Sequence, residues 1–460
     1  MTTTANKLKK IWLIALPIVI QGIVFQIQSL TDKYFLGNLD AIYLSALGAA
    51  QFPFSASLDA FVAMSVGLII YVSQFKGAGS EDSISKYTKS SILYASCISL
   101  LIFALWFLFT EPILILLHVD AAILPESAHY IRICSFYLLI LGIDTSLQAM
   151  LQGIGKTKPI MITSLMKVFL NVVLSYILIF GKLGFDPMNI KGAAIGTLLS
   201  NLIASLFLMI YCFILKHQEY ALHTHLHEYL NLKPYIGTVK IGVPTAMEYF
   251  LWNASNLVLL AFLNSLSYEA TAVYTLTFGI EVVIYAVFNG TGKASMTLIG
   301  QDIGAADYES AHDYVKICII VNSLLITICV LLFVVFSKPL LGIFTTSTKL
   351  INLASPYLIF TGIILFPKSI NVIVGNAIRS HGNTKWMLYS QIIGSIFVIS
   401  CSFILVKVLH LGILAIYITL FLDETIRSSI NGIYYRKKYC VANLINSSDL
   451  IHHSFSQADC

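Results

Sequence analysis

Charged residues are scarce in this chain, and their scarcity excludes an ordinary soluble domain. Asp, Glu, Lys and Arg make up 11% of the 460 residues, whereas soluble domains carry about a quarter. Hydrophobic residues make up 57%, and the mean hydropathy is +0.83. This composition indicates a polytopic membrane protein.

Long polar blocks and alternating polar patterns are also missing. The absence of a long polar block leaves no room for a separate soluble domain, and the apolar runs are continuous, unlike the in-and-out alternation of a transmembrane barrel. At about 20 residues per span, the chain accommodates about a dozen helices. The expected fold is therefore all-α, with twelve transmembrane helices.

Paired cysteines and converging polar groups are absent as well. The eight cysteines are scattered without a C-x-x-C pair, which argues against disulfides and metal sites. The alternating His223, His225 and His227 lie in a polar stretch, where such histidines are more often solvated than metal-bound. No His, Asp and Ser constellation appears within the spans, so neither an enzyme nor a cofactor is expected, and the net charge of +5 needs no nucleic acid to explain it.

Apolar runs place the expected helices in two sets of six. The first set covers roughly 11–32, 43–73, 90–110, 130–152, 160–180 and 192–215, and the second roughly 241–264, 270–298, 315–336, 353–376, 386–407 and 411–434. Basic residues gather before the first helix and after the last one, which predicts that both termini are cytoplasmic in a plasma (inner) membrane.

Four segments follow from this pattern. We expect an N-lobe at 1–215, a cytoplasmic linker at 216–240, a C-lobe at 241–440 and a disordered polar tail at 441–460.

The two lobes are related by an internal repeat, in which Pro17 recurs as Pro244. The separation of these two prolines is the repeat spacing, and at the same spacing Gln21 corresponds to Glu248. Two further matches are Gly77-Ala78 with Gly304-Ala305 and Gly155-Lys-Thr157-Lys158 with Gly382-Asn-Thr384-Lys385. Six helices per copy give both copies the same orientation in the membrane, and parallel repeats of this kind are a transporter architecture with substrate bound between the halves.

Asp32 lies at the far end of the first apolar run. A carboxylate in or near hydrocarbon is costly, so it normally faces a protein interior or a wet cavity and serves a function. An interfacial helix cap beside Lys33 is the alternative interpretation of this residue.

Several stretches together resemble one transporter family. Leu16-Pro17, Gln21 and Asp32, followed by Phe35-Leu36-Gly37-Asn38, resemble the opening of the multidrug and toxic compound extrusion (MATE) family. Later stretches that resemble it are Gln301-x-x-Gly304-Ala305-x-Asp307, Asn171 with Leu178-Ile-Phe-Gly181, Gly192-Ala-Ala-Ile-Gly196, Arg379-x-His-Gly382-Asn-Thr384 and Asp423-Glu424-x-x-Arg427. The resemblance extends from about residue 11 to 440.

The resemblance implies a secondary antiporter with two six-helix lobes around a central cleft. Such a protein, expected as a monomer in the bilayer, expels amphipathic and often cationic organic compounds, drugs or metabolites, in exchange for protons or sodium. A lipid-linked saccharide flippase of the same superfamily is the alternative. It would require a cationic cleft, and the acidic candidates count against it.

The resemblance also assigns cation-coupling residues. In the family an aspartate at the place of Asp32 binds the cation in the N-lobe, and here Gln28 and Asn171 are expected to assist it. Sodium at Asp32 is thus the one metal ion expected. Glu248 matches the C-lobe acid of one branch of the family. Glu281 is either a second C-lobe carboxylate or paired with Lys293 or with a group on the helix expected at 353–376.

Four more polar residues lie within the expected helices. Asp144 precedes Asn371 by the repeat spacing and is expected to pair with Lys167. The sodium-coupled branch often carries an acid in the helix that here contains Lys368. A fixed ammonium would oppose a nearby cation, which favours protons or a Glu248–Lys368 pair.

The substrate cleft is expected to be lined by Gln21 and by aromatic side chains, which bind organic cations through cation–π contacts. The aromatic candidates lie on helices that line the cleft in the resembled family: Phe52, Phe54, Tyr249, Trp252, Tyr274, Phe278 and Tyr285.

Overall fold

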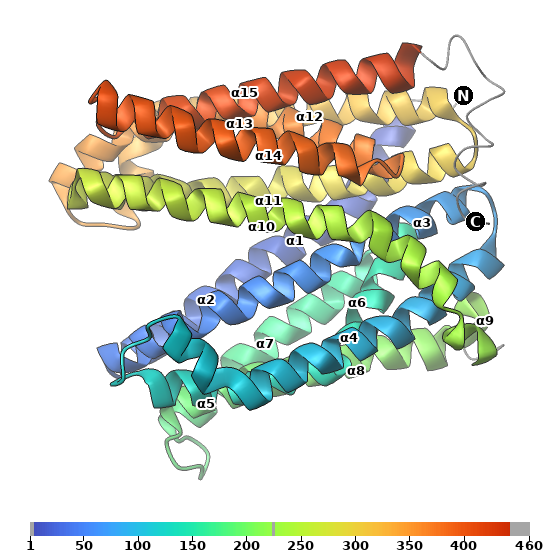
Figure 1. Ribbon diagram of the computed structural model, residues 1–460, viewed down its shortest axis with the longest axis horizontal. Coiled ribbons are helices and arrows are strands. Elements are labelled where there is room, and N and C mark those ends of the chain that lie inside the picture. Colours follow the sequence, from blue (N-terminus) through green and yellow to red (C-terminus); the bar gives the residue numbers. More distant parts are fainter. Residues whose placement is uncertain (1–3, 223–225, 442–460) are drawn as a thin grey trace. The chain divides into compact units, whose positions relative to one another are not determined.

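Helix is the only regular structure in the residues that this computed structural model describes, 4–222 and 226–441 (Figure 1). This confirms the expected all-α architecture. The helices of the first half are α1 (Thr4–Gly37), α2 (Ala41–Met64), α3 (Val66–Gly77), α4 (Glu81–Leu116), α5 (Leu124–Ser135), α6 (Leu138–Gly153), α7 (Lys158–Phe180), α8 (Asn189–Ile210) and the short α9 (His217–Tyr220). Those of the second half are α10 (Leu232–Leu266), α11 (Tyr268–Gly304), α12 (Tyr308–Gly342), α13 (Thr348–Ser380), α14 (Thr384–Phe403) and α15 (Leu414–Tyr435).

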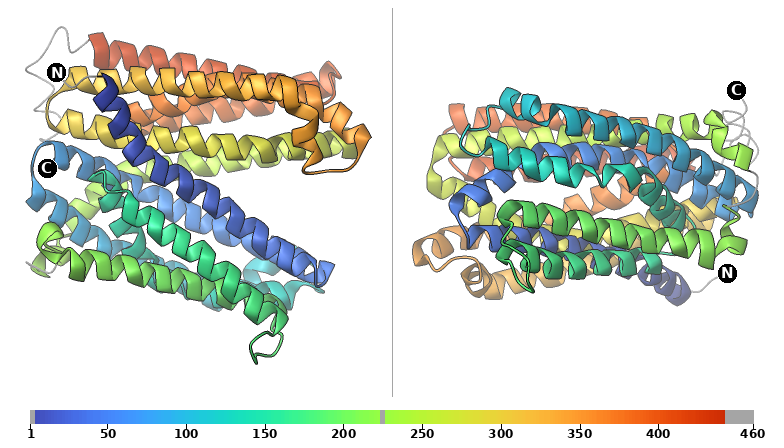
Figure 2. Two further views of the ribbon diagram at one scale, coloured as in Figure 1. Left: turned by 180° about the vertical axis from the view of Figure 1, so that it is seen from behind. Right: turned by 90° about the horizontal axis from the view of Figure 1, so that it is seen from below.

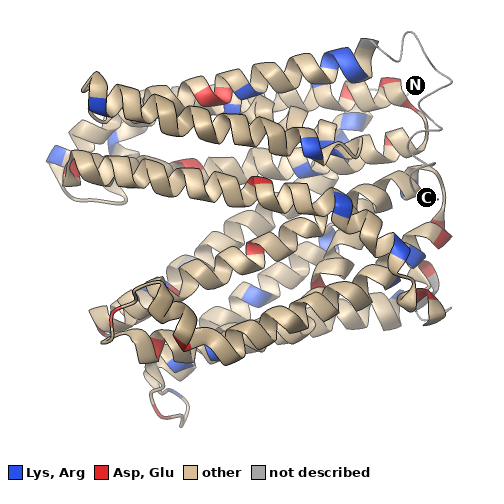
Figure 3. Ribbon diagram, viewed as in Figure 1, with Lys and Arg blue, Asp and Glu red and all other residues tan. Residues whose placement is uncertain are grey.

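Ten helical segments of the described chain are long and apolar enough to cross a membrane, or eleven if α5 and α6 form one bent span. The last expected span, α15, carries Asp423, Glu424 and Arg427 in its middle, so hydropathy does not single it out. Charged residues are sparse along the other helices (Figure 3). The count of twelve spans therefore stays a prediction.

Two expected helices are broken. The helix expected at 43–73 is interrupted at Ser65, and the one expected at 130–152 bends by 52° between α5 and α6. Neither break contains a proline. At each break a serine, Ser65 or Ser135, donates a side-chain hydrogen bond of 2.7 Å to the carbonyl three residues earlier.

The backbone repeats at the spacing of the sequence repeat. Helix α4 leaves helical geometry at Phe109, three residues before Pro112, and α12 does so at Phe336, three residues before Pro339. A proline inside a helix removes a hydrogen bond and clashes with the preceding turn. Left-handed backbone also recurs, at Gly79 and Ala306 and at Gly155 and Gly382. In all these pairs the two copies are separated by the repeat spacing.

The chain forms two compact units, whose boundaries lie inside two helices. The first unit comprises residues 20–246, and the second comprises the chain up to Val19 together with residues 247–460. The chain changes unit shortly after Pro17 in α1 and shortly after Pro244 in α10, and both helices continue through their proline. The lobe boundaries expected at 215 and 241 stay a prediction, and this exchange of helix ends was not expected.

The start of α1 packs within the second unit, beside α11 and α12 (Figure 2). Ile11 and Ala15 are fully buried in one cluster with Ala294 and Tyr314. Lys7 adds an ion pair of 2.8 Å to Asp313 on α12.

The segment expected as a linker, 216–240, contains α9 and the beginning of α10. It is fixed to α4 in the first unit, where buried Lys89 pairs with Glu228 at 3.0 Å and Ser90 donates to the carbonyl of Asn231 at 2.5 Å. His223 and His225 lie outside the described residues, as does the tail from 442 onward.

Gly67 on α3 allows α3 to pack directly on the backbone of α10 within the first unit. A methyl group at Gly67 would overlap the carbonyl of Thr238, so we expect Gly67→Ala to cost about 1–3 kcal/mol of stability through overpacking. The thermal midpoint of purified protein measures this loss. Gly48 on α2 has no atom within 4 Å of an added methyl, and Gly48→Ala should leave the midpoint unchanged or slightly higher. Equal midpoints for the two variants would contradict the packing argument.

Candidate functional site

Asp32 on α1 is buried in the first unit, among polar side chains of α7 and α8. Only 2% of the residue is exposed. Thr197 donates to its Oδ2 at 3.5 Å, and the amide of Asn171 donates to Thr197 at 3.0 Å and to Ser175 at 3.3 Å. Within the described chain Oδ1 of Asp32 accepts no hydrogen bond. Asn171 is thus linked to Asp32 through Thr197, whereas the side chain of half-buried Gln28 makes no hydrogen bond in the described residues, and the part of both in cation coupling stays a prediction.

Asp144 on α6 is buried in the first unit with its positive partner. Its Oδ2 accepts hydrogen bonds from Tyr137 at 2.7 Å, from Gln148 at 2.8 Å and from the ammonium of Lys167 at 3.2 Å. The same ammonium lies 5.3 Å from the centre of the Tyr137 ring. This arrangement neutralises Asp144 and joins α6 to α7.

In the second unit, the alternative pairing of Glu248 with Lys368 is wrong. Glu248 on α10 accepts a hydrogen bond of 2.5 Å from Arg379, which also donates to Asn376 at 3.2 Å. Lys368 instead donates to Glu281 on α11 at 2.5 Å. Lys368 and Arg379 are three helical turns apart on α13, about 16 Å along a helix, so the two acids meet different bases at different depths.

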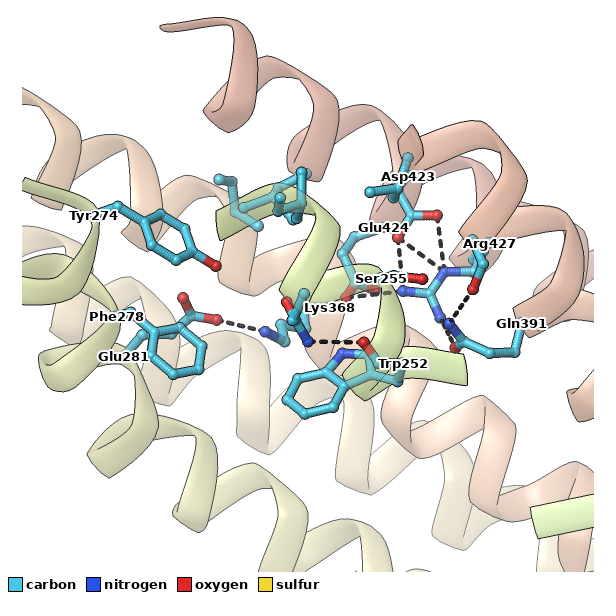
Figure 4. A pocket seen from close by; sticks show the side chains of 16 residues that line it. Trp252, Ser255, Tyr274, Phe278, Glu281, Lys368, Gln391, Asp423, Glu424 and Arg427 are labelled. Carbon is cyan, nitrogen blue, oxygen red and sulfur yellow. Dashed lines mark hydrogen bonds and ion pairs between the residues drawn. The ribbon is translucent and has the colours of Figure 1, made fainter. Parts of the chain in front are cut away.

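The Glu281–Lys368 pair borders a cavity inside the second unit (Figure 4). The centre of a water molecule can occupy about 40 Å³ of it, room for a few water molecules. Aromatic groups among its lining residues are Trp252, Tyr274 and Phe278, and the charged and amide groups are Glu281, Lys368, Gln391, Asp423, Glu424 and Arg427.

Arg427 holds the two acids of α15 together at this cavity. It donates to both oxygens of Asp423 at 2.7–3.1 Å and to Gln391 at 2.8 Å, and it pairs with Glu424 at 3.2 Å. Asn371 donates to the second oxygen of Glu424 at 3.0 Å. Every one of these groups is at least nine-tenths buried, so the network is a continuous polar path from α13 to α15.

The cavity of the second unit lies where the sequence repeat places the counterparts of Asp32 and its neighbours. At the repeat spacing, Leu259 corresponds to Asp32 and Val398 corresponds to Asn171, and both line the cavity. The second unit therefore lacks the acid of the first at this place and has its acids on α11 and α15 instead.

The aromatic residues expected at a substrate cleft differ in their surroundings. Trp252, Tyr274 and Phe278 line the cavity, and Tyr285 lies with its ring 5.4 Å from the ammonium of Lys368. Phe54 is buried against Trp106 in the core of the first unit. The remaining candidates are half-buried Gln21 and exposed Phe52 and Tyr249.

Sequence reasoning missed the pairing of Arg379 with Glu248. It placed Arg379 only in a family motif, Arg379-x-His-Gly382-Asn-Thr384, at the end of the helix expected at 353–376. A signal was nevertheless present in the repeat. Gln21 and Gln152 precede Glu248 and Arg379 by the repeat spacing, so both members of the ion pair replace amides of the first copy. A paired change from amide to charge indicates contact.

We expect this pair to behave as a unit in a double-mutant cycle. Glu248→Gln or Arg379→Gln alone leaves one largely enclosed charge, with 12–13% of its side chain exposed, without its partner and should cost about 3 kcal/mol. The double variant recreates the Gln21 and Gln152 combination and should recover most of that loss, measured as the thermal midpoint. Lys76→Gln, at an exposed pair with Glu81, is the control and should cost less than about 1 kcal/mol. Additive losses in the double variant would contradict the coupling.

Known proteins match this chain along almost its whole length. The chain is 26% identical over 434 residues to the "Probable multidrug resistance protein NorM" of Thermotoga maritima, spanning 93% of this chain and 92% of that protein. It is 25% identical to the "Uncharacterized transporter YisQ" of Bacillus subtilis, spanning 85% and 88%. The fold matches an outward-facing multidrug resistance MATE family transporter of the MOP superfamily with a TM-score of 0.84 at 17% identity, over 96% of this chain and 99% of that one.

The family model described as MatE matches the chain twice, over residues 17–177 and 244–404. Both matches begin at a repeated proline, and they are displaced by the repeat spacing, which confirms the internal repeat. The two matches together cover well over half of the chain. By this measure, and in keeping with its paired helical halves, the chain belongs to the MatE family of membrane transporters.

Proposed function

We propose that this protein is a cation-coupled antiporter that exports amphipathic, often cationic organic compounds by alternating access. Its family and the multidrug resistance proteins among its relatives support export of organic compounds. The parallel repeat supports alternating access, because such transporters bind substrate between two similar halves. We place the protein in the plasma (inner) membrane as a monomer with both termini in the cytoplasm.

The observation that carries the coupling proposal is the isolation of Asp32. The described chain contains five buried acids, and Asp144, Glu281, Asp423 and Glu424 each have a basic partner within 3.2 Å. Asp32 has no such partner among the described residues. A buried carboxylate without a basic partner needs a proton or another cation to offset the cost of leaving water.

The groups around Asp32 suit either coupling ion. Thr197, Ser175 and Asn171 present hydroxyl and amide oxygens, the hard ligands that small cations such as sodium prefer. The same groups hydrogen bond to a carboxylate and to a carboxylic acid. When the bound cation alters substrate affinity, reciprocity requires substrate to alter cation affinity, which is the thermodynamic basis of antiport.

Cation gradients imposed on proteoliposomes test this proposal. We expect efflux of a fluorescent organic cation to respond to either a proton or a sodium gradient, and the comparison of the two gradients identifies the ion. Asp32→Asn keeps the shape of the side chain but removes its charge, so the gradient response should fall roughly fivefold or more.

A matched control uses the same substitution elsewhere. Asp40 caps the start of α2 by accepting from the backbone of Ile42, and Asn caps helices equally well. Asp40→Asn should therefore transport as the wild type does. Full gradient-driven transport by Asp32→Asn would refute the assignment of the coupling site.

A further inference from the structure

The cavity of the second unit contains more acids than bases. Glu281, Asp423 and Glu424 are carboxylates, and Lys368 and Arg427 are cations, so the ionised cluster carries one net negative charge. Arg427 is held by Asp423, Glu424 and Gln391. Lys368 is therefore the only cation that faces Glu281, at 2.5 Å, in the described residues of this cavity.

The ammonium group of Lys368 lies among groups that could equally bind a free cation. The ammonium donates to Glu281 and lies over the Tyr285 ring, 5.4 Å from the ring centre, and Figure 4 shows it directed at Glu281. An ammonium is a compact point charge with three donors, unlike the planar guanidinium of an arginine. Carboxylates and aromatic faces are the groups that bind monovalent ammonium ions.

We propose that Lys368 is a tethered counter-ion that fills a monovalent-cation site of the second unit, formed by Glu281 with Glu424, Asp423 and the cavity between them. The site lies at the repeat equivalent of the Asp32 cluster, because Leu259 and Val398 line it. One half of the protein thus takes its cation from solution, and the other holds its cation covalently.

Removal of the amine should expose this site. Without Lys368 the cluster carries two net negative charges in a low-dielectric interior, which is costly unless a cation enters. Truncation to alanine also adds to the cavity the space that the lysine side chain filled. The proposal goes beyond antiport. It rests on the proposed function in one respect only, namely that the exchangeable cation binds at Asp32 in the first unit.

The test measures cation binding to purified full-length protein, without transport. In an Asp32→Asn background, which removes the exchangeable site, thermal midpoints are recorded in methylammonium, sodium or potassium chloride against choline chloride at equal ionic strength. We expect Lys368→Ala to gain a saturable rise of the midpoint with at least one of the three small cations. The Asp32→Asn parent should show no such rise.

Lys349→Ala is the matched control, since Lys349 lies on the same helix in an exposed pair with Glu269. It should gain no cation response. A flat response of Lys368→Ala to all three cations, or an equal rise in the parent or in the control, would overturn the proposal.

A second comparison covers the case in which Lys368→Ala does not fold. Methylammonium added during purification should then increase the yield of monodisperse Lys368→Ala protein, and Glu281→Gln combined with Lys368→Ala should give that yield without it. Failure of both rescues would also overturn the proposal. Since none of these measurements involves a gradient, they are separate from the outcome for Asp32.

Discussion

Neutralisation of charge inside a helical bundle is the constraint on which this structure depends. Water is excluded there, so an ionised side chain must meet an opposite charge or several donors. Asp144 meets both, with Lys167, Tyr137 and Gln148 on a single oxygen. The same requirement joins Glu248 to Arg379 across two helices. Against this background the carboxylate of Asp32 is informative, because among the described residues it is the one buried acid without a basic partner.

Sequence patterns predicted what depends on composition and spacing along the chain. Hydropathy gave the helices, and the separation of matching motifs gave the repeat, since both are visible without knowing which helices touch. Asn171 beside Asp32 followed from family resemblance. The sequence left the partner of Lys368 open between Glu248 and Glu281, because pairing depends on depth in the bundle, and the spacing on α13 separates Lys368 from Arg379. The break at Ser65 was also missed, since no proline marks it.

Two copies of one backbone have acquired different electrostatics. The prolines of α4 and α12 and the left-handed turns are retained at equal spacing, so the helix geometry has been preserved. The polar groups have not. Gln21 and Gln152 are replaced by an ion pair, and Asp32 is replaced by Leu259 next to a cavity whose acids come from other helices. Because one backbone shape accommodates both sets of polar groups, duplication can produce halves with separate tasks.

The exchange of helix ends between the units has a consequence for biosynthesis. The start of α1 leaves the ribosome first, but its partners on α11 and α12, among them Ala294 and Tyr314, are translated only after the whole first unit, whereas domains generally fold as soon as their segments are complete. The first unit is complete once residue 246 has been made. The second must wait with its earliest segment already inserted, so a gene cut within 216–240 would encode two fragments, neither of which contains a whole unit.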